Sequence, residues 1–155
     1  MIFDRDGTLI ENVPYNGDPE AVRPFEGARE ALDRLRAQHI PLAVVSNQSG
    51  IGRGLITQEQ TEAVNRRVEE LLGPFDVWIY CPHEPAADCD CRKPKPKMIL
   101  DAARALGVEP ECCIVLGDSE SDFEAARNAG AQWLAINEKQ TLAQAINVIL
   151  SNMSS

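Results

Sequence analysis

The sequence has 155 residues, enough for one domain with a proper core and too few for a large second domain. Apolar residues make up 44% and charged residues 25%, as in ordinary globular proteins, and no apolar run has the length of a membrane span. Fifteen basic against twenty-four acidic residues give a net charge of −9, which disfavours binding to a nucleic-acid backbone. We therefore expect a monomeric cytoplasmic protein with a single domain over 1–155 and with neither a nucleic-acid nor a membrane partner.

A short apolar run opens the chain and ends in two carboxylates, Asp4 and Asp6, followed by Gly7. Side chains at i and i+2 of a strand point to the same side, so both carboxylates would share one face. Such a pair needs a cation, and a divalent metal would let one aspartate attack phosphorus while the other transfers protons. An ordinary Asp-Gly turn is the competing interpretation. A calcium-binding EF-hand loop is excluded, because Leu9 and Tyr15 stand where that loop needs Gly and Glu.

The three residues before Asp4 make a very short first strand. Either that strand takes in further residues or the start of the chain is shortened. Residues 11–24 contain three prolines and a glycine, which predicts an irregular loop over the end of the strand. Apolar residues at helical spacing then predict a helix over 25–39, and the apolar run 40–45 predicts a buried strand.

The second half of the chain alternates in the same way. Thr57 and Gln60 have the spacing of a helix-capping box, and Gly107 marks the end of a later helix. Ser121 and Glu124 are expected to cap a short helix over 121–129. The other expected elements are a turn at 46–50, strands at 75–80, 112–116 and 131–136, a long loop at 81–94 and a last helix that includes 142–150.

Strands that alternate with helices predict an α/β fold with a five-stranded parallel sheet covered on both faces. Asp4, Ser46 and Asp118 each stand where an apolar strand run ends. In open α/β sheets ligands bind outside the carboxyl ends of the strands, so these three side chains are expected in one crevice.

These strand ends carry groups suited to phosphoryl transfer. Asp118 is the natural further oxygen ligand for Mg²⁺, although Asp and Ser also cap ordinary helices. Ser46 and Asn47 can hold phosphate oxygens, although they equally suit a plain turn. Lys93 belongs to the basic cluster nearest a strand end and could be the fixed cation that a phosphoryl group needs, whereas most such charge runs simply face solvent.

A second candidate metal site is made of cysteine and histidine. Cys81, His83, Cys89 and Cys91 provide three sulfurs and one imidazole within a short loop. Four such ligands form a closed set, which is typical of structural zinc. Free thiols on a mobile loop are the alternative, and Cys112 and Cys113 are better explained as small apolar residues of a buried strand.

Four stretches together resemble the haloacid dehalogenase superfamily of phosphatases. In chain order they read Asp-Arg-Asp-Gly-Thr-Leu, Ser-Asn-Gln-Ser-Gly, Arg-Lys-Pro and Gly-Asp-Ser-Glu-Ser-Asp. The Cys-Pro-His and Cys-Asp-Cys-Arg-Lys-Pro-Lys-Pro segments are similar to its zinc-containing, histidinol-phosphatase-type branch. The resemblance covers nearly the whole chain and implies a Rossmann-like three-layer α/β/α fold, without a separate cap domain and with a zinc-stapled loop at the entrance.

The resemblance also implies roles for single residues. Asp4 would be the nucleophile that forms an aspartyl-phosphate, and Asp6 the acid and then the base. Mg²⁺ would be held by Asp4, Asp118 and the backbone carbonyl of Asp6. The residues expected to bind the phosphoryl group or the rest of the substrate are Ser46, Asn47, Gln48, Arg53, Arg92 and Lys93.

The function implied by the resemblance is Mg²⁺-dependent hydrolysis of a small phosphorylated sugar, with a heptose bisphosphate as the first expectation. Histidinol phosphate is the alternative substrate within the same branch, and the net charge disfavours phosphorylated DNA ends. A non-catalytic, zinc-stapled binding domain that keeps the fold is the alternative of another class.

Overall fold

The computed structural model describes residues 1–154, which form one five-stranded parallel sheet and six α-helices. The order of the strands across the sheet is β3-β2-β1-β4-β5. The strands are β1 (Ile2–Phe3), β2 (Ala43–Asn47), β3 (Val77–Cys81), β4 (Ile114–Gly117) and β5 (Gln132–Ala135). All strand pairs are parallel, as the alternation of strands and helices predicts.

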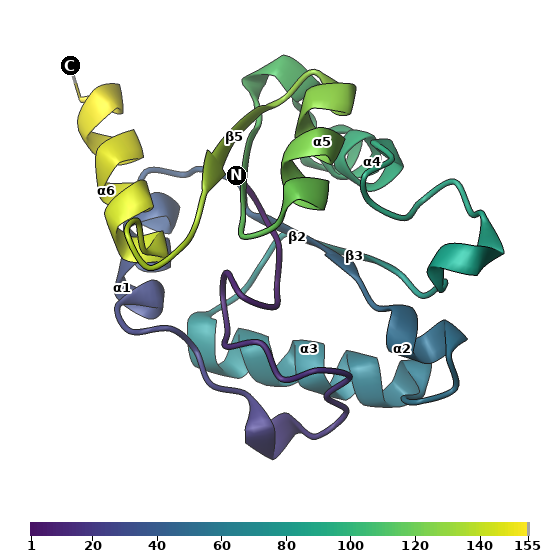
Figure 1. The fold of residues 1–155 in the computed structure, drawn as a ribbon. Coiled ribbons are helices and arrows are strands. Elements are labelled where there is room, and N and C mark those ends of the chain that lie inside the picture. The colour runs from purple at the N-terminus through teal and green to yellow at the C-terminus, as the bar shows by residue number, and fades with distance from the viewer. Residues whose placement is uncertain (155) are drawn as a thin grey trace.

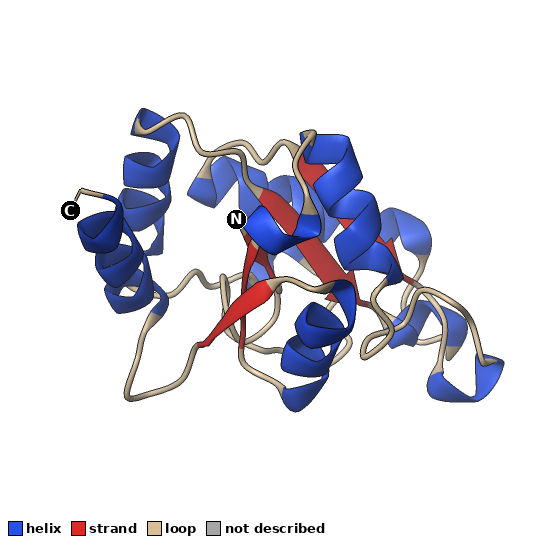
Figure 2. Cartoon of the chain, turned by 90° about the horizontal axis from the view of Figure 1, so that it is seen from above, coloured by secondary structure: helices blue, strands red, loops and turns tan. Residues whose placement is uncertain are grey.

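Helices cover both faces of this sheet (Figures 1 and 2). They are α1 (Ala28–Ala37), α2 (Ser49–Gly52), α3 (Gln58–Leu72), α4 (Lys97–Leu106), α5 (Glu120–Ala129) and α6 (Leu142–Met153). One face packs against α1, α3 and α6, and the other against α4 and α5. Within residues 1–154 no helix is both long enough and apolar enough to cross a membrane. The predicted three-layer α/β/α architecture is confirmed.

The first strand is two residues long, yet it lies at the centre of the sheet. Ile2 and Phe3 pair with β2 on one side and with β4 on the other. Both side chains are fully buried and point to opposite core halves, and burial of side chains of this size contributes about 1.5–3 kcal/mol each. The backbone N–H of Asp4 donates to the carbonyl of Leu116 at 3.0 Å and so extends the ladder. Asp4 is therefore fixed at the end of a strand that has neighbours on both sides.

Capping residues set several helix boundaries. Thr57 and Gln60 form the predicted capping box at the start of α3, because each side chain binds the other residue's backbone N–H. Gly107 follows α4 in a left-handed conformation that glycine adopts easily. These boundaries follow from local sequence.

Several predicted boundaries were wrong: β3 and β4 begin at Val77 and Ile114, two residues later than predicted, and α5 and β2 differ as well. Ser119, not Ser121, caps α5, and its partner in the capping box is Asp122 rather than Glu124. The Ser-x-x-acid pattern occurs twice in succession here, so local sequence alone cannot choose between the two. Strand β2 runs on to Asn47 instead of ending at residue 45, because pairing with β3 continues to the end of both strands.

The two adjacent cysteines differ from each other. Cys113 is buried as predicted, but Cys112 is exposed and belongs to a 3-10 turn, Pro110–Cys112, that precedes β4. The proline at the start of this turn accounts for the difference, because it favours a turn over a strand at that point.

Candidate active site and metal-binding loop

Two of the three predicted strand-end residues, Asp4 and Asp118, lie together beside one cavity, whose lining includes Asp4 but neither Asp118 nor Ser46. Asp4 follows β1, Asn47 ends β2 and Asp118 follows β4, all at the carboxyl edge of the sheet. A cavity of about 320 Å³ opens at this edge, between the strand ends and the loop that follows β1. Its lining includes Asp4, Asp6 and Lys93. This is the crevice expected of a parallel α/β sheet.

Lys93 is the fixed cation of the site. Only 3% of the residue is exposed, and its Nζ donates to Asp4 Oδ1 at 3.1 Å, to Asp122 Oδ1 at 2.7 Å and to the Val45 carbonyl at 2.8 Å. Burial by itself lowers the pKa of Lys93, but the charges of Asp4 and Asp122 outweigh it and leave that pKa above its usual value. The ammonium group therefore stays charged, with a fixed position and three acceptors.

Asp4 is a carboxyl group whose proton is hard to remove. Burial is the main reason that its pKa is raised to about 8; the Lys93 ammonium opposes this rise, and the charges of Asp122 and Asp118 add to it. The pKa of Asp118 is also raised, first by desolvation and then by the charge of Asp122. A divalent cation would relieve this repulsion, because it favours the ionised form of each carboxyl group.

Three carboxylates lie close enough to share such a cation. Oxygen atoms of Asp4, Asp118 and Asp122 all lie within 4.8 Å of one another. Oxygen ligands of this kind suit Mg²⁺. Gly7 makes room for the group, since a Cβ atom at its position would lie 2.2 Å from Asp118 Oδ2. The donor set fits a magnesium site.

Asp122 is a residue of this site to which the sequence assigned no role. It is 1% exposed, and its second oxygen, Oδ2, accepts hydrogen bonds from the Ser119 hydroxyl at 2.9 Å and from the Ser119 backbone N–H at 3.2 Å. Gly117 allows this close approach, because a Cβ there would lie 2.4 Å from the same oxygen. Its position one helical turn after Asp118 is the sequence feature that could have pointed to it.

The side chain of Asp6 does not belong to the carboxylate group among the described residues. Its two oxygens accept from Nε and Nη2 of Arg5, each at 3.1 Å. Nε2 of Gln48 donates to Asp6 Oδ2 at 3.0 Å and approaches Ser46 Oγ at 2.6 Å. Asp6 therefore lies beside the predicted phosphate-binding residues and is fixed by nitrogen donors.

Ser46 and Asn47 have different surroundings. Ser46 is 3% exposed and lies next to Gln48, which lines the cavity. Asn47 uses its side chain on the backbone of Lys93: its Oδ1 accepts from the Lys93 N–H at 3.1 Å, and its Nδ2 donates to the Lys93 carbonyl at 3.4 Å. The Asn47 side chain thus fixes the position of Lys93.

The two predicted arginines are outside the lining of this cavity. Arg53 lies over the ring of Tyr15, with its guanidinium carbon 6.0 Å from the ring centre. Arg92 donates to the carbonyl of His83 at 3.4 Å. Tyr15 does line the cavity, so Arg53 lies near its rim.

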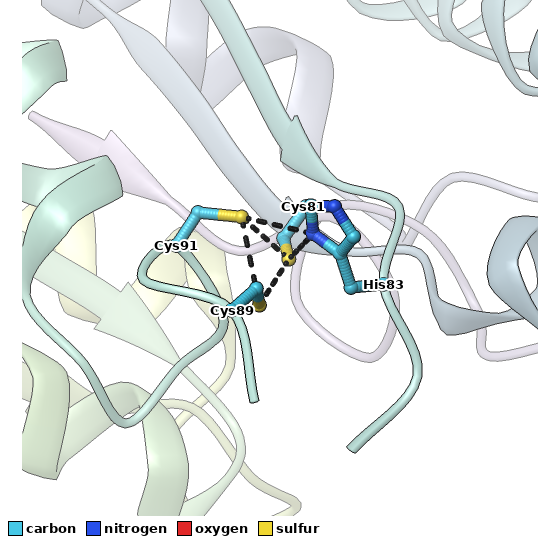
Figure 3. A group of neighbouring side chains, drawn as sticks. All are labelled: Cys81, His83, Cys89 and Cys91. Atoms are coloured by element: carbon cyan, nitrogen blue, oxygen red, sulfur yellow. Dashed lines mark hydrogen bonds between the residues drawn. The ribbon is translucent and has the colours of Figure 1, made fainter. Parts of the chain in front are cut away.

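The cysteine and histidine residues form a compact group at the end of β3, where Cys81 lies, and on the loop that follows (Figure 3). The Sγ atoms of Cys81 and Cys91 each lie 3.3 Å from Nδ1 of His83, and the sulfur–sulfur distances range from 2.8 to 3.8 Å. All five cysteines are free thiols. Three sulfurs and one imidazole nitrogen directed at a common point make a candidate metal site.

The thiols of this group differ in acidity. Burial and, after it, the neighbouring thiol of Cys91 together raise the pKa of Cys81 to about 12. For Cys89, desolvation also acts to raise the pKa, but the backbone N–H of Arg92 and the neighbouring thiols lower it to about 6. A bound metal would favour the thiolate form at every position.

The chain has close relatives among known proteins. A family model for haloacid dehalogenase-like hydrolases matches residues 12–130. The D-glycero-beta-D-manno-heptose-1,7-bisphosphate 7-phosphatase of Pasteurella multocida is 36% identical over 139 residues, which cover 83% of this chain and 76% of the relative. The enzyme of the same name from Pseudomonas aeruginosa is 37% identical over 137 residues, which cover 85% of this chain and 77% of the relative. The crystal structure of D,D-heptose 1,7-bisphosphate phosphatase from B. bronchiseptica, complexed with magnesium and phosphate, superimposes with a TM-score of 0.89 at 27% identity and covers 98% of both chains. The chain therefore belongs to the haloacid dehalogenase-like hydrolases, as its sequence motifs predict.

Proposed function

We propose that this protein is a Mg²⁺-dependent phosphatase that removes the 7-phosphate of D-glycero-β-D-manno-heptose 1,7-bisphosphate. The observation that carries the proposal is the arrangement of Asp4, Lys93 and Asp118 at the carboxyl edge of the sheet. The curated relatives that are 36% and 37% identical carry the name of this activity, which supports the choice of substrate and anomer.

In the proposed reaction Asp4 attacks phosphorus and forms an aspartyl-phosphate. Asp6 gives a proton to the departing sugar alcohol and then takes one from the water that hydrolyses the aspartyl-phosphate. Lys93 keeps a positive charge next to Asp4 Oδ1, where it would stabilise the charge on the oxygens of the phosphoryl group that Asp4 attacks. Asp4, Asp118 and the backbone carbonyl of Asp6 would hold Mg²⁺, which supplies charge neutralisation for the nucleophile and the phosphoryl group.

Other residues are proposed to bind the substrate. Gln48 lines the cavity next to Asp6 and contacts the hydroxyl of buried Ser46, and both side chains would contact the transferred phosphoryl group. Arg53 and Arg92 lie outside the cavity and would reach the distal part of a bisphosphate, since a guanidinium pairs well with phosphate. Asn47 would act through its backbone and through Lys93.

We further propose that the loop binds one structural Zn²⁺ ion. Cys81, His83, Cys89 and Cys91 provide four protein ligands, which leaves no open position for chemistry. Free thiols in a small protein fit a reducing compartment, which supports the proposed cytoplasmic location. We also propose that the protein acts as a monomer on a small phosphorylated sugar.

Phosphate release from a substrate panel tests the proposed function. Purified protein with Mg²⁺ is offered the heptose 1,7-bisphosphate in both anomeric forms, histidinol phosphate and common hexose phosphates, and kcat/KM is measured for each. We expect the β-heptose bisphosphate to have the highest value. A higher value for histidinol phosphate would contradict the proposed substrate, and no release from any ester would favour a non-catalytic binding domain.

A further inference from the structure

Arg5 is the largest fully buried side chain among the described residues, and the reaction proposed above does not use it. It stands between Asp4 and Asp6, and only 2% of it is exposed. Arginine is almost never fully buried unless its charge is paired, because removing it from water is costly. A buried guanidinium at the centre of a candidate active site therefore needs an explanation.

The contacts of Arg5 point toward Asp6. Nε and Nη2 donate to the two oxygens of the Asp6 carboxylate, each at 3.1 Å, in the parallel two-bond geometry that a guanidinium favours. The remaining terminal nitrogen, Nη1, donates to Oδ1 of Asn65 on α3 at 2.8 Å. Arg5 is thus fixed at its far end by a helix and holds Asp6 with its other two nitrogens.

Asp6 itself stays accessible from the cavity. Its side chain is 27% exposed while that of Arg5 is 2% exposed, and both residues line the cavity. The guanidinium of Arg5 therefore lies on the buried side of the Asp6 carboxylate. Gln48, which directly follows β2, donates to the same carboxylate. This arrangement leaves Asp6 little rotational freedom.

We propose that Arg5 is a positioning residue that fixes the Asp6 carboxylate in the orientation needed to protonate the leaving alcohol, with Asn65 holding Arg5 in place. The proposal rests on the phosphatase function proposed above. A misplaced acid should matter only where the leaving group needs a proton. Departure of a sugar alcohol needs one, whereas 4-nitrophenolate leaves without being protonated.

The test compares two substrates in the variant Arg5→Lys, which keeps the charge and loses the two-bond geometry. We expect kcat/KM for the sugar phosphate to fall about 100-fold, the lower range of general acid catalysis, and kcat/KM for 4-nitrophenyl phosphate to fall less than about threefold. The parameter kcat/KM reports the steps up to departure of the leaving group, so the later role of Asp6 as a base does not enter.

A second variant keeps the test decisive if Arg5→Lys does not fold. Asn65→Leu removes the acceptor of Nη1 without touching Asp6, and it should lower kcat/KM about fivefold for the sugar phosphate, the value of one hydrogen bond, with little change for the aryl ester. Arg29→Lys is the matched control, because Arg29 forms an exposed ion pair with Asp33 on α1; it should change neither value.

Equal losses on both substrates in the folded variants would overturn the proposal, because they would indicate general damage to the site. Wild-type values of kcat/KM for both esters in Asn65→Leu and Arg5→Lys would overturn it as well. Failure of the proposed function gives a different result, since the wild-type protein would then release no phosphate from either ester. If the natural substrate is another sugar phosphate, the comparison uses that ester and remains valid.

Discussion

The two candidate metal sites of this protein are held together in different ways. At the carboxyl edge of the sheet, Asp4 and Asp122 face a buried lysine, Lys93, that neutralises part of their charge. On the loop after β3, the described side chains of the cysteine and histidine group include no such cation, and the group closes on itself (Figure 3). We therefore expect the acidic site to keep its shape without an ion and the sulfur site to need one.

The two sites are also connected. Lys93 follows Cys91 by two residues, and the Asn47 side chain binds the Lys93 backbone from the end of β2. The backbone N–H of Gln48 donates to the carbonyl of Cys81 at 2.8 Å, which ties the start of the loop to the same segment. We therefore expect an ordered conformation of the loop after β3 to help hold Lys93 in place.

The largest effect is expected at Asp4, where a substitution should remove activity without lowering stability. Asp4→Asn should lower kcat about 10⁴-fold or more, because an amide is no nucleophile toward phosphorus. The thermal midpoint should not fall, since the change removes a carboxyl group whose ionisation is opposed by burial. Phosphate release and calorimetry measure the two quantities, and a variant with full activity would rule out Asp4 as the nucleophile.

Lys93→Met should damage both activity and fold. It leaves Asp122, and Asp4 wherever that group is ionised, without a buried counter-charge, and loss of one partner of a buried pair costs about 3–5 kcal/mol. Denaturant unfolding measures this cost. Added Mg²⁺ should restore part of the stability, because it replaces the missing positive charge; a stability equal to that of the wild type without Mg²⁺ would contradict the role given to Lys93.

Removal of zinc should lower stability more than removal of magnesium. At a free zinc concentration about 100-fold above the dissociation constant, binding contributes about 2.7 kcal/mol to the free energy of unfolding. Metal analysis of the wild type should find about one zinc per chain, and Cys89→Ser should reduce this content and the thermal midpoint together. The exposed Cys112→Ser is the control, and a zinc-free protein of full stability would contradict the site.

Magnesium binding should depend on pH at the acidic site. Because the pKa of Asp4 is raised to about 8, this carboxyl group holds a proton at neutral pH and must lose it when the metal binds. The apparent affinity should therefore rise with pH, by up to about tenfold per pH unit for one proton, and level off above about pH 8. Calorimetric titration at several pH values measures this slope, and an affinity independent of pH from about 6 to 8 would refute it.

The smallest expected effect tests the link between the two sites. Asn47→Ala removes the hydrogen bonds to the Lys93 backbone and should cost about 1 kcal/mol of stability, with a modest loss of kcat. Zinc content should stay the same, because the two hydrogen bonds that are removed join Asn47 to the Lys93 backbone and not to a sulfur or imidazole ligand. A loss of zinc in this variant would mean that the loop depends on β2 more than the contacts indicate.

The sequence determined a large part of this protein. Alternation of apolar runs and amphipathic stretches predicted the parallel sheet and its helices, since these periodicities are local. Three polar residues at strand ends, Asp4, Ser46 and Asp118, predicted the place of the site, because parallel strands bring their carboxyl ends to one edge. The cysteine and histidine group could also be predicted, because its four members lie close together in the sequence.

Tertiary structure alone decided which side chains meet. Asp122 binds Lys93 and Arg5 binds Asn65, pairs separated by 29 and 60 residues, and no local pattern encodes such distances. Pairing with β3 carried β2 on to Asn47, and the cap of α5 lay at Ser119 although Ser121 fits the same local pattern. Local preferences fix the elements, but burial and charge pairing across the assembled sheet fix the contacts, because both depend on atoms that are distant in the chain.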